Sequence, residues 1–220
     1  MTAITAESLN TAVAGVLSRM TVGVGATFVV AALINALGLV PVLFQGILGY
    51  VFIFAPLAMS LYLGFRGDSM TTGTIRAWFY AFATVMGISL SMIFAVYTSA
   101  SIALALLSTT VSFAALAGWG YFTRRDLSGW GPFLFAGVIG VVVASVIGIF
   151  IESTAFQQTI NVLCILIFLG LTAYDMNRIR DVLWTGGEDV ERLQWFSALS
   201  LYINFINIFV SMLQLFGNRE

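Results

Sequence analysis

The sequence predicts an all-α integral membrane protein, a bundle of seven transmembrane helices with the seventh helix at its centre. Three observations lead to this fold class. Hydrophobic residues make up 60% of the 220-residue chain, charged residues only 9%, and the mean hydropathy of +1.01 lies far above that of soluble domains. Long segments of the chain carry no charge, and most arginines fall in alternate connections between them.

Five segments lack Asp, Glu, Lys and Arg, and they cover residues 20–65, 77–123, 127–151, 153–174 and 193–218. The first two are too long for one crossing, because about 46 residues of helix would reach about 69 Å against a hydrocarbon core of about 30 Å. Turn-forming residues gather at 38–41 and 97–101, so we expect the chain to fold back there. The predicted helices cover residues 20–37, 45–65, 77–97, 101–122, 130–150, 159–177 and 196–215.

The arginines predict how these helices are oriented, because short cytoplasmic connections collect positive charge. Arg19 precedes the first predicted helix, and seven more arginines fall in every second connection: Arg66, Arg76, Arg124, Arg125, Arg178, Arg180 and Arg192. We therefore expect the N-terminus inside the cell, the C-terminus outside, and a short cytoplasmic segment at residues 1–19. Residues 1–220 are expected to form one transmembrane domain.

The residues that the chain lacks exclude several functions. Without any lysine it cannot form a retinal Schiff base, and without any histidine it cannot be a Ser-His intramembrane protease or hold a His-ligated zinc ion. Its only cysteine, Cys164, lies within a predicted membrane helix, so no disulfide is expected. We expect a protein that is not an enzyme, has no cofactor and does not bind nucleic acid.

Asp175 is the one carboxylate that a predicted membrane helix would carry inward. A charged side chain at the bilayer centre costs on the order of 2.5–3.5 kcal/mol, so such a residue normally faces a cavity, a partner or a permeation path. The alternative interpretation is an acid at the helix end, held at the membrane surface by Arg178 or Arg180.

The last predicted helix carries a polar stripe along its whole length. Its members follow one another at steps of three and four residues: Ser197, Ser200, Asn204, Asn207, Ser211 and Gln214. Facing lipid, these amides and hydroxyls would lack partners, so the stripe is expected to face other helices or a wet cavity. It could serve as hydrogen-bonding contact between helices or line a pathway, and the sequence leaves both readings open.

The segments GLTAYDMNRIRD and ALSLYINFINIFVSMLQLFG, together with MGISLSMIF in the third predicted helix, resemble the Bax inhibitor / YccA-like family of seven-helix membrane proteins. The short acidic loop WTGGEDVER between the last two helices fits as well. The resemblance implies six helices around a central seventh, a bacterial inner membrane location and a pH-sensitive calcium leak.

In that family, aspartates of the sixth and seventh helices form a latch, and an arginine near the inner end of the second helix pairs with it. The resemblance places the first aspartate at Asp175, the second at Asn204 and the arginine at Arg66. Two carboxylates in contact share a proton and can switch with pH, whereas Asn has the shape of a protonated Asp but cannot titrate. We therefore expect a latch held in one state.

The resemblance also makes Asp175 a weak, transient ligand of calcium. One carboxylate with amide, hydroxyl and backbone oxygens gives a weak site, because calcium prefers six to eight oxygen ligands, and weak binding suits conduction. Two other function classes remain: a regulator that binds a membrane protease, a cell-death protein or another membrane protein, and a small-solute or proton-coupled transporter. Besides calcium ions, the expected partner is the lipid bilayer.

Overall fold

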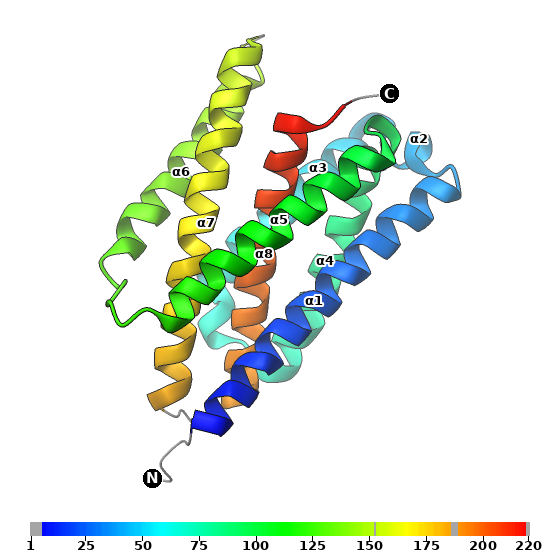
Figure 1. Ribbon diagram of the computed structural model, residues 1–220. Helices are drawn as coiled ribbons and strands as arrows, with labels where there is room; N and C mark the ends of the chain where they lie inside the picture. The colour runs from blue at the N-terminus through cyan, green and yellow to red at the C-terminus, as the bar shows by residue number, and fades with distance from the viewer. Residues whose placement is uncertain (1–5, 152, 186–188, 219–220) are drawn as a thin grey trace. The chain divides into compact units, whose positions relative to one another are not determined.

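The computed structural model describes residues 6–151, 153–185 and 189–218, and Figure 1 traces its helices. Within these residues seven helices are long and apolar enough to cross a membrane, which confirms the predicted fold class. They are α1 (Ala6–Ala36), α3 (Gly46–Arg66), α4 (Thr72–Val96), α5 (Ser99–Phe122), α6 (Trp130–Gly148), α7 (Thr154–Thr185) and α8 (Val190–Phe216).

The two predicted turns fall where they were expected. Between α1 and α3 the chain forms a single helical turn, α2 (Val40–Leu43), flanked by Gly38 and Gly46 with φ of +65° and +58°. Residues with a side chain rarely adopt these left-handed angles, so the two glycines allow the reversal. The second break is Tyr97, which adopts an extended conformation at the end of α4.

Most of the helices extend further than predicted, although α6 ends at Gly148 rather than 150, and several arginines expected in loops lie inside helices. Arg19 lies within α1, Arg76 within α4, Arg178 and Arg180 within α7, and Arg192 within α8. The apolar pattern reports only the part of a helix that contacts hydrocarbon. The 32 residues of α7 give a length of about 48 Å, well beyond a core of about 30 Å.

The chain forms two compact units. Of the described residues, 10–98 and 189–202 make up the first, called here the N-terminal unit. Residues 6–9, 99–151, 153–185 and 203–218 make up the C-terminal unit, and α8 therefore supplies its first half to one unit and its second half to the other.

Tyr202 of α8 is the centre of the N-terminal unit. Its ring lies 5.8 Å from the rings of both Phe79 and Phe82 of α4. Its hydroxyl lies 2.6 Å from the hydroxyl of Thr27 in α1, which also donates to the Ala83 carbonyl at 3.0 Å. Both polar side chains are buried, and each has the partner that a hydrocarbon environment demands.

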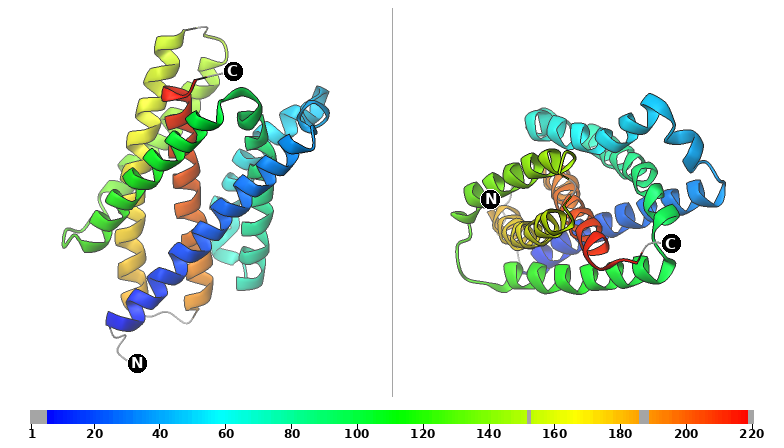
Figure 2. Two further views of the ribbon diagram at one scale, coloured as in Figure 1. Left: turned by 45° about the vertical axis from the view of Figure 1, so that its right-hand side comes forward. Right: turned by 90° about the horizontal axis from the view of Figure 1, so that it is seen from above.

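In the C-terminal unit α7 packs against α5 and α6, as Figure 1 and the two views of Figure 2 show. The contact with α5 is close at Gly120, where an added Cβ would collide with the backbone of Ala173. Phe113 of α5 packs edge-on against Phe205 of α8, with ring centroids 5.5 Å apart. Gly120 has no side chain and therefore lets the backbones of α5 and α7 approach closely.

The last helix is the most buried of the seven. Of its most apolar 18-residue segment 67% is buried, compared with 44% for α7 and 11% for α6. This is the burial expected of a central helix, in agreement with the sequence prediction.

Gly120→Ala tests the contact between α5 and α7. We expect it to lower the free energy of unfolding by about 1–3 kcal/mol, because the new methyl group overlaps backbone that cannot rotate away. Gly118→Ala is the matched control on the same helix, since no atom lies within 4 Å of its added Cβ. It should leave stability unchanged or raise it by up to about 1 kcal/mol through helix propensity. Thermal unfolding in detergent measures both, and equal destabilisation would contradict the close contact.

Candidate functional site

Asp175 lies well inside α7 rather than at its end. The helix continues to Thr185, so the last ten residues add about 15 Å beyond the carboxylate. The alternative interpretation placed Arg178 or Arg180 against Asp175, but Arg180 binds Asp181 and backbone carbonyls of α5 and its loop, and the Arg178 side chain is exposed. Asp175 itself is half-buried.

Asn204 of α8 binds Asp175 directly. The Asn204 amide nitrogen donates to Oδ2 of Asp175 at 2.8 Å, and the Asn204 side chain is 3% exposed. Only the NH₂ end of an amide can donate, so Asn204 is the donor and the Asp175 carboxyl group is the acceptor. The two residues that the resemblance assigned to the latch are thus in contact.

The remaining members of the α8 stripe differ in their surroundings. Ser197 and Ser211 are buried, and Ser200 and Asn207 are half-buried. The Asn207 amide donates to the Ile203 carbonyl of its own helix at 2.8 Å. Gln214 is exposed, contrary to the expectation for the stripe as a whole, because it lies in the last turn of α8.

A second polar face, on α7, was missed by the sequence analysis. Asn161, Cys164 and Thr172 share one side of this helix with Asp175, at steps of three, eight and three residues. All three are buried, and Ser211 of α8 lies within hydrogen-bonding reach of the Cys164 thiol. The spacing relative to Asp175 was visible in the sequence and could have identified this face.

Thr109 of α5 adds a polar group to the interior of the same unit. Its side chain is fully buried, and its hydroxyl has no hydrogen-bond partner in the part of the chain that the structure describes. Buried hydroxyls normally have a partner, and Thr109 is therefore an exception that calls for an explanation.

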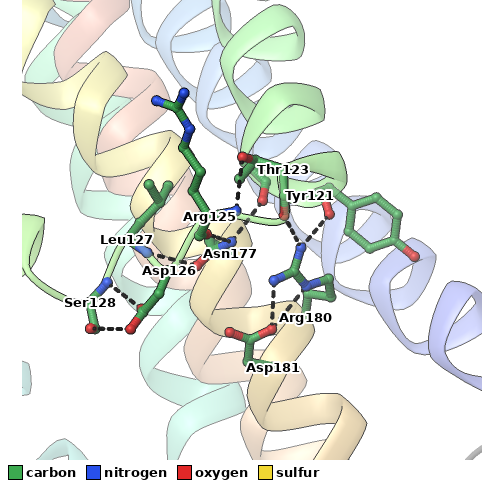
Figure 3. Close-up of polar contacts among 10 residues, drawn as sticks. Tyr121, Thr123, Arg125, Asp126, Leu127, Ser128, Asn177, Arg180 and Asp181 are labelled. Carbon is green, nitrogen blue, oxygen red and sulfur yellow. Dashed lines mark hydrogen bonds and ion pairs between the residues drawn. The ribbon is translucent and has the colours of Figure 1, made fainter.

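The connection between α5 and α6 is held in place by two side chains of α7 (Figure 3). The Asn177 amide donates to the carbonyls of Gly120 at 3.2 Å and Arg125 at 3.4 Å, and its oxygen accepts from the Leu127 amide. The Arg180 guanidinium donates to the carbonyls of Tyr121 at 2.9 Å and Thr123 at 2.6 Å. These bonds satisfy carbonyls that the end of α5 would otherwise leave unpaired.

Asp126 caps the turn within this connection. Its carboxylate accepts from the Ser128 amide at 2.8 Å and from the Ser128 hydroxyl at 3.0 Å. These two hydrogen bonds, the backbone one first, lower the pKa of the Asp126 carboxyl. The group is therefore an anion whose oxygens are already bound to its own turn.

In the N-terminal unit, the first turn of α8 is tied to the turn that follows α3. The Arg192 guanidinium donates to the carbonyls of Met70 at 2.8 Å and Gly67 at 2.9 Å. Asp189 caps α8 through the Arg192 amide and accepts from the Thr72 hydroxyl, and both bonds lower its pKa. Arg66 ends α3 in this unit with an exposed side chain, and its pairing with Asp175 stays a prediction.

Comparison with known proteins identifies the family. A model of the family described as "Inhibitor of apoptosis-promoting Bax1" matches residues 9–220. The chain belongs to this Bax inhibitor family. With seven candidate spans it is a multi-pass integral membrane protein.

Several bacterial proteins are similar to this chain over much of its length. The inner membrane protein YbhL of Escherichia coli strain K12 is 36% identical over 96% of this chain and 93% of its own. A protein of Caulobacter vibrioides is 42% identical over 76% of this chain and 68% of its own. A protein of Rickettsia prowazekii is 35% identical over 81% of this chain and 76% of its own.

No cluster of three or more His, Cys, Asp or Glu side chains forms among the residues that the structure describes in this Bax inhibitor family member. The polar groups of the C-terminal unit interior are mostly neutral amides and hydroxyls, and Asp175 is the acidic residue between α7 and α8.

Proposed function

We propose that this protein is a cation leak for calcium, and that the contact between Asp175 and Asn204 holds it in one state. The observation that carries this proposal is the hydrogen bond of 2.8 Å between these side chains, which joins the polar faces of α7 and α8. Separation of the two helices would free one carboxylate and one amide inside a hydrocarbon layer, so the contact has the chemistry of a latch.

The Asn204 amide fixes the hydrogen-bonding pattern of that latch. In a pair of aspartates one carboxyl keeps a proton and donates it to the other, and pH sets how often this state is occupied. The Asn204 amide donates permanently in place of that proton. The pH sensitivity that the family resemblance implies is therefore reduced in this chain over the ordinary range.

The polar faces supply a route for an ion within the C-terminal unit. Asn161, Cys164 and Thr172 on α7 and Asn207 and Ser211 on α8 carry polar atoms at depths beyond Asp175. The unpaired hydroxyl of Thr109 has the property expected of a group that a passing ion or water would contact. One carboxylate with neutral oxygens binds calcium weakly, and weak binding lets an ion leave again.

The proposed location is the bacterial inner membrane, as the name of the Escherichia coli relative states for that protein. The proposed orientation has the N-terminus in the cytoplasm and the C-terminus outside, because most of the arginines cluster toward the ends and connections that would then be cytoplasmic.

Thiol labelling of intact cells tests this orientation. Cysteines placed singly at Asn218 and at Ser128, in a Cys164→Ala background, are expected to react with a membrane-impermeant maleimide at Asn218 only. Labelling at Ser128 and protection at Asn218 would reverse the assigned orientation.

A regulator that acts through a membrane partner is the second candidate function. It is favoured by the description of the matching family as an inhibitor of an apoptosis-promoting protein. On this reading the protein passes no ions, Asp175 is a structural group, and the partner is a membrane protease, a cell-death protein or another membrane protein. Calcium flux into liposomes that contain only this protein separates the two functions.

Asp175→Asn removes the charge while it keeps the shape of the side chain. We expect calcium flux to fall by about tenfold or more, because a hydrogen bond or ligand contact of a charged group contributes about 1.5–3 kcal/mol. Asp181→Asn is the matched control, since this acid lies six residues further along α7 and is 56% exposed. If Asp175→Asn leaves calcium flux unchanged, the latch is refuted. If the folded wild-type protein gives no calcium flux, the result favours the regulator.

Asn204→Asp should restore a titratable pair. Two carboxylates in contact share a proton, so the variant is expected to show a pH-dependent step in calcium flux that the present sequence lacks. Flux is compared between about pH 6 and 8, where carboxylates that share a site can titrate. Thermal unfolding at each pH controls for loss of the fold. If the two pH profiles superimpose, Asn204 does not set the pH response.

A further inference from the structure

Two arginines in the connection between α5 and α6 are left without partners inside the described protein. Arg124 and Arg125 are both exposed, and neither guanidinium forms a hydrogen bond or ion pair with a residue that the structure describes. In Figure 3 the Arg125 side chain extends away from the loop, and no dashed line reaches its guanidinium. By contrast, Arg180 in the same view binds a carboxylate and two carbonyls.

The reason lies in what α7 does to this loop. The carboxyl end of a helix carries partial negative charge, and arginines that follow it would ordinarily fold back onto its carbonyls. Here Arg180 occupies the carbonyls of Tyr121 and Thr123, and Asn177 occupies that of Gly120. The helix-end carbonyls that would attract Arg124 and Arg125 are therefore already hydrogen-bonded to Arg180 and Asn177.

The acid next to these arginines is also engaged elsewhere. Asp126 follows Arg125 directly, but both of its oxygens accept hydrogen bonds from Ser128. Asp181, the other acid in Figure 3, pairs with Arg180 at 2.8 Å. Neither Arg124 nor Arg125 is therefore paired with a carboxylate of the loop, and Arg124, Arg125 and Asp126 together leave a net charge of +1.

Aromatic residues indicate the depth of the loop in the membrane. Trp119, near the end of α5, and Trp130, at the start of α6, lie on either side of the connection with ring centroids 6.1 Å apart. Their side chains are 41% and 46% exposed, and that of Phe122 is 79% exposed. Exposed tryptophans of membrane proteins gather at the level of the lipid headgroups, which is where phosphate groups lie.

We propose that Arg124 and Arg125 bind the headgroup phosphate of an anionic phospholipid, with the Trp119 and Trp130 pair against its glycerol backbone and upper acyl chains. A guanidinium matches a phosphate group through two parallel hydrogen bonds, and a planar indole tolerates the mixed polar and apolar layer beside it. Asn177 and Arg180 act as positioning residues, because they hold the loop in the conformation that leaves both guanidinium groups available. This site does not depend on the proposed calcium leak.

Native mass spectrometry of the full chain in detergent tests the proposal, with phosphatidylglycerol and phosphatidylcholine as the added lipids. We expect the wild type to bind phosphatidylglycerol more tightly than phosphatidylcholine. The double variant Arg124→Gln/Arg125→Gln should lose about 30-fold in affinity for phosphatidylglycerol, the contribution of two arginines near an anionic surface. Arg76→Gln is the matched control, an exposed arginine early in α4, and should retain the preference.

Retention of the phosphatidylglycerol preference by the double variant would overturn the assignment, as would equal loss in Arg76→Gln. Glycerol 3-phosphate is added as a competitor, and displacement of the lipid at similar concentrations would identify a free phosphate ligand instead of a lipid. If the double variant does not fold, the single variants Arg124→Gln and Arg125→Gln are measured. Each is then expected to lose about fivefold in affinity for phosphatidylglycerol, and no loss in either would overturn the proposal.

Discussion

Hydrocarbon offers no hydrogen bonds, so polar groups that this chain carries into the bilayer need partners within the protein, and this constraint organises the fold. The buried hydroxyls of Thr27 and Tyr202 satisfy each other, and the Asp175 carboxylate accepts from the Asn204 amide. Hydroxyls on outward faces bond to their own helix four residues back, as those of Thr84 and Thr159 do. The buried Thr109 hydroxyl departs from this rule, because it has no hydrogen-bond partner among the described residues.

The same constraint explains what the sequence could predict. Charge-free segments are visible in the sequence, and they located all seven spanning helices and the reversals at residues 38–41 and 97–101. The contact of Asp175 with Asn204 followed from the family resemblance, which assigned both residues to one latch. The polar stripe of the last helix predicted that this helix is central, because amides and hydroxyls that face lipid would lack hydrogen-bond partners.

The sequence could not predict where the helices end or which side chains hold the connection between α5 and α6, and the reasons are physical. Hydrophobicity ends where the bilayer ends, whereas backbone hydrogen bonds continue, so arginines such as Arg178 and Arg180 lie inside α7. Asn177 and Arg180 bind backbone carbonyls of α5 and its loop, and a backbone carbonyl has no sequence signature. The polar face of α7 was missed for a different reason, since seven residues without a polar side chain separate Cys164 from Thr172.

The division of α8 between the two units has a consequence for cooperativity. Tyr202 belongs to the aromatic centre of the N-terminal unit, and Asn204, two residues further along, belongs to the polar contact of the C-terminal unit. Between them the backbone is one uninterrupted helix, and helices form and melt cooperatively over several residues. Loss of helical structure on one side of this boundary is therefore expected to weaken the helix on the other side, which would couple the unfolding of the two units through the shared backbone of α8.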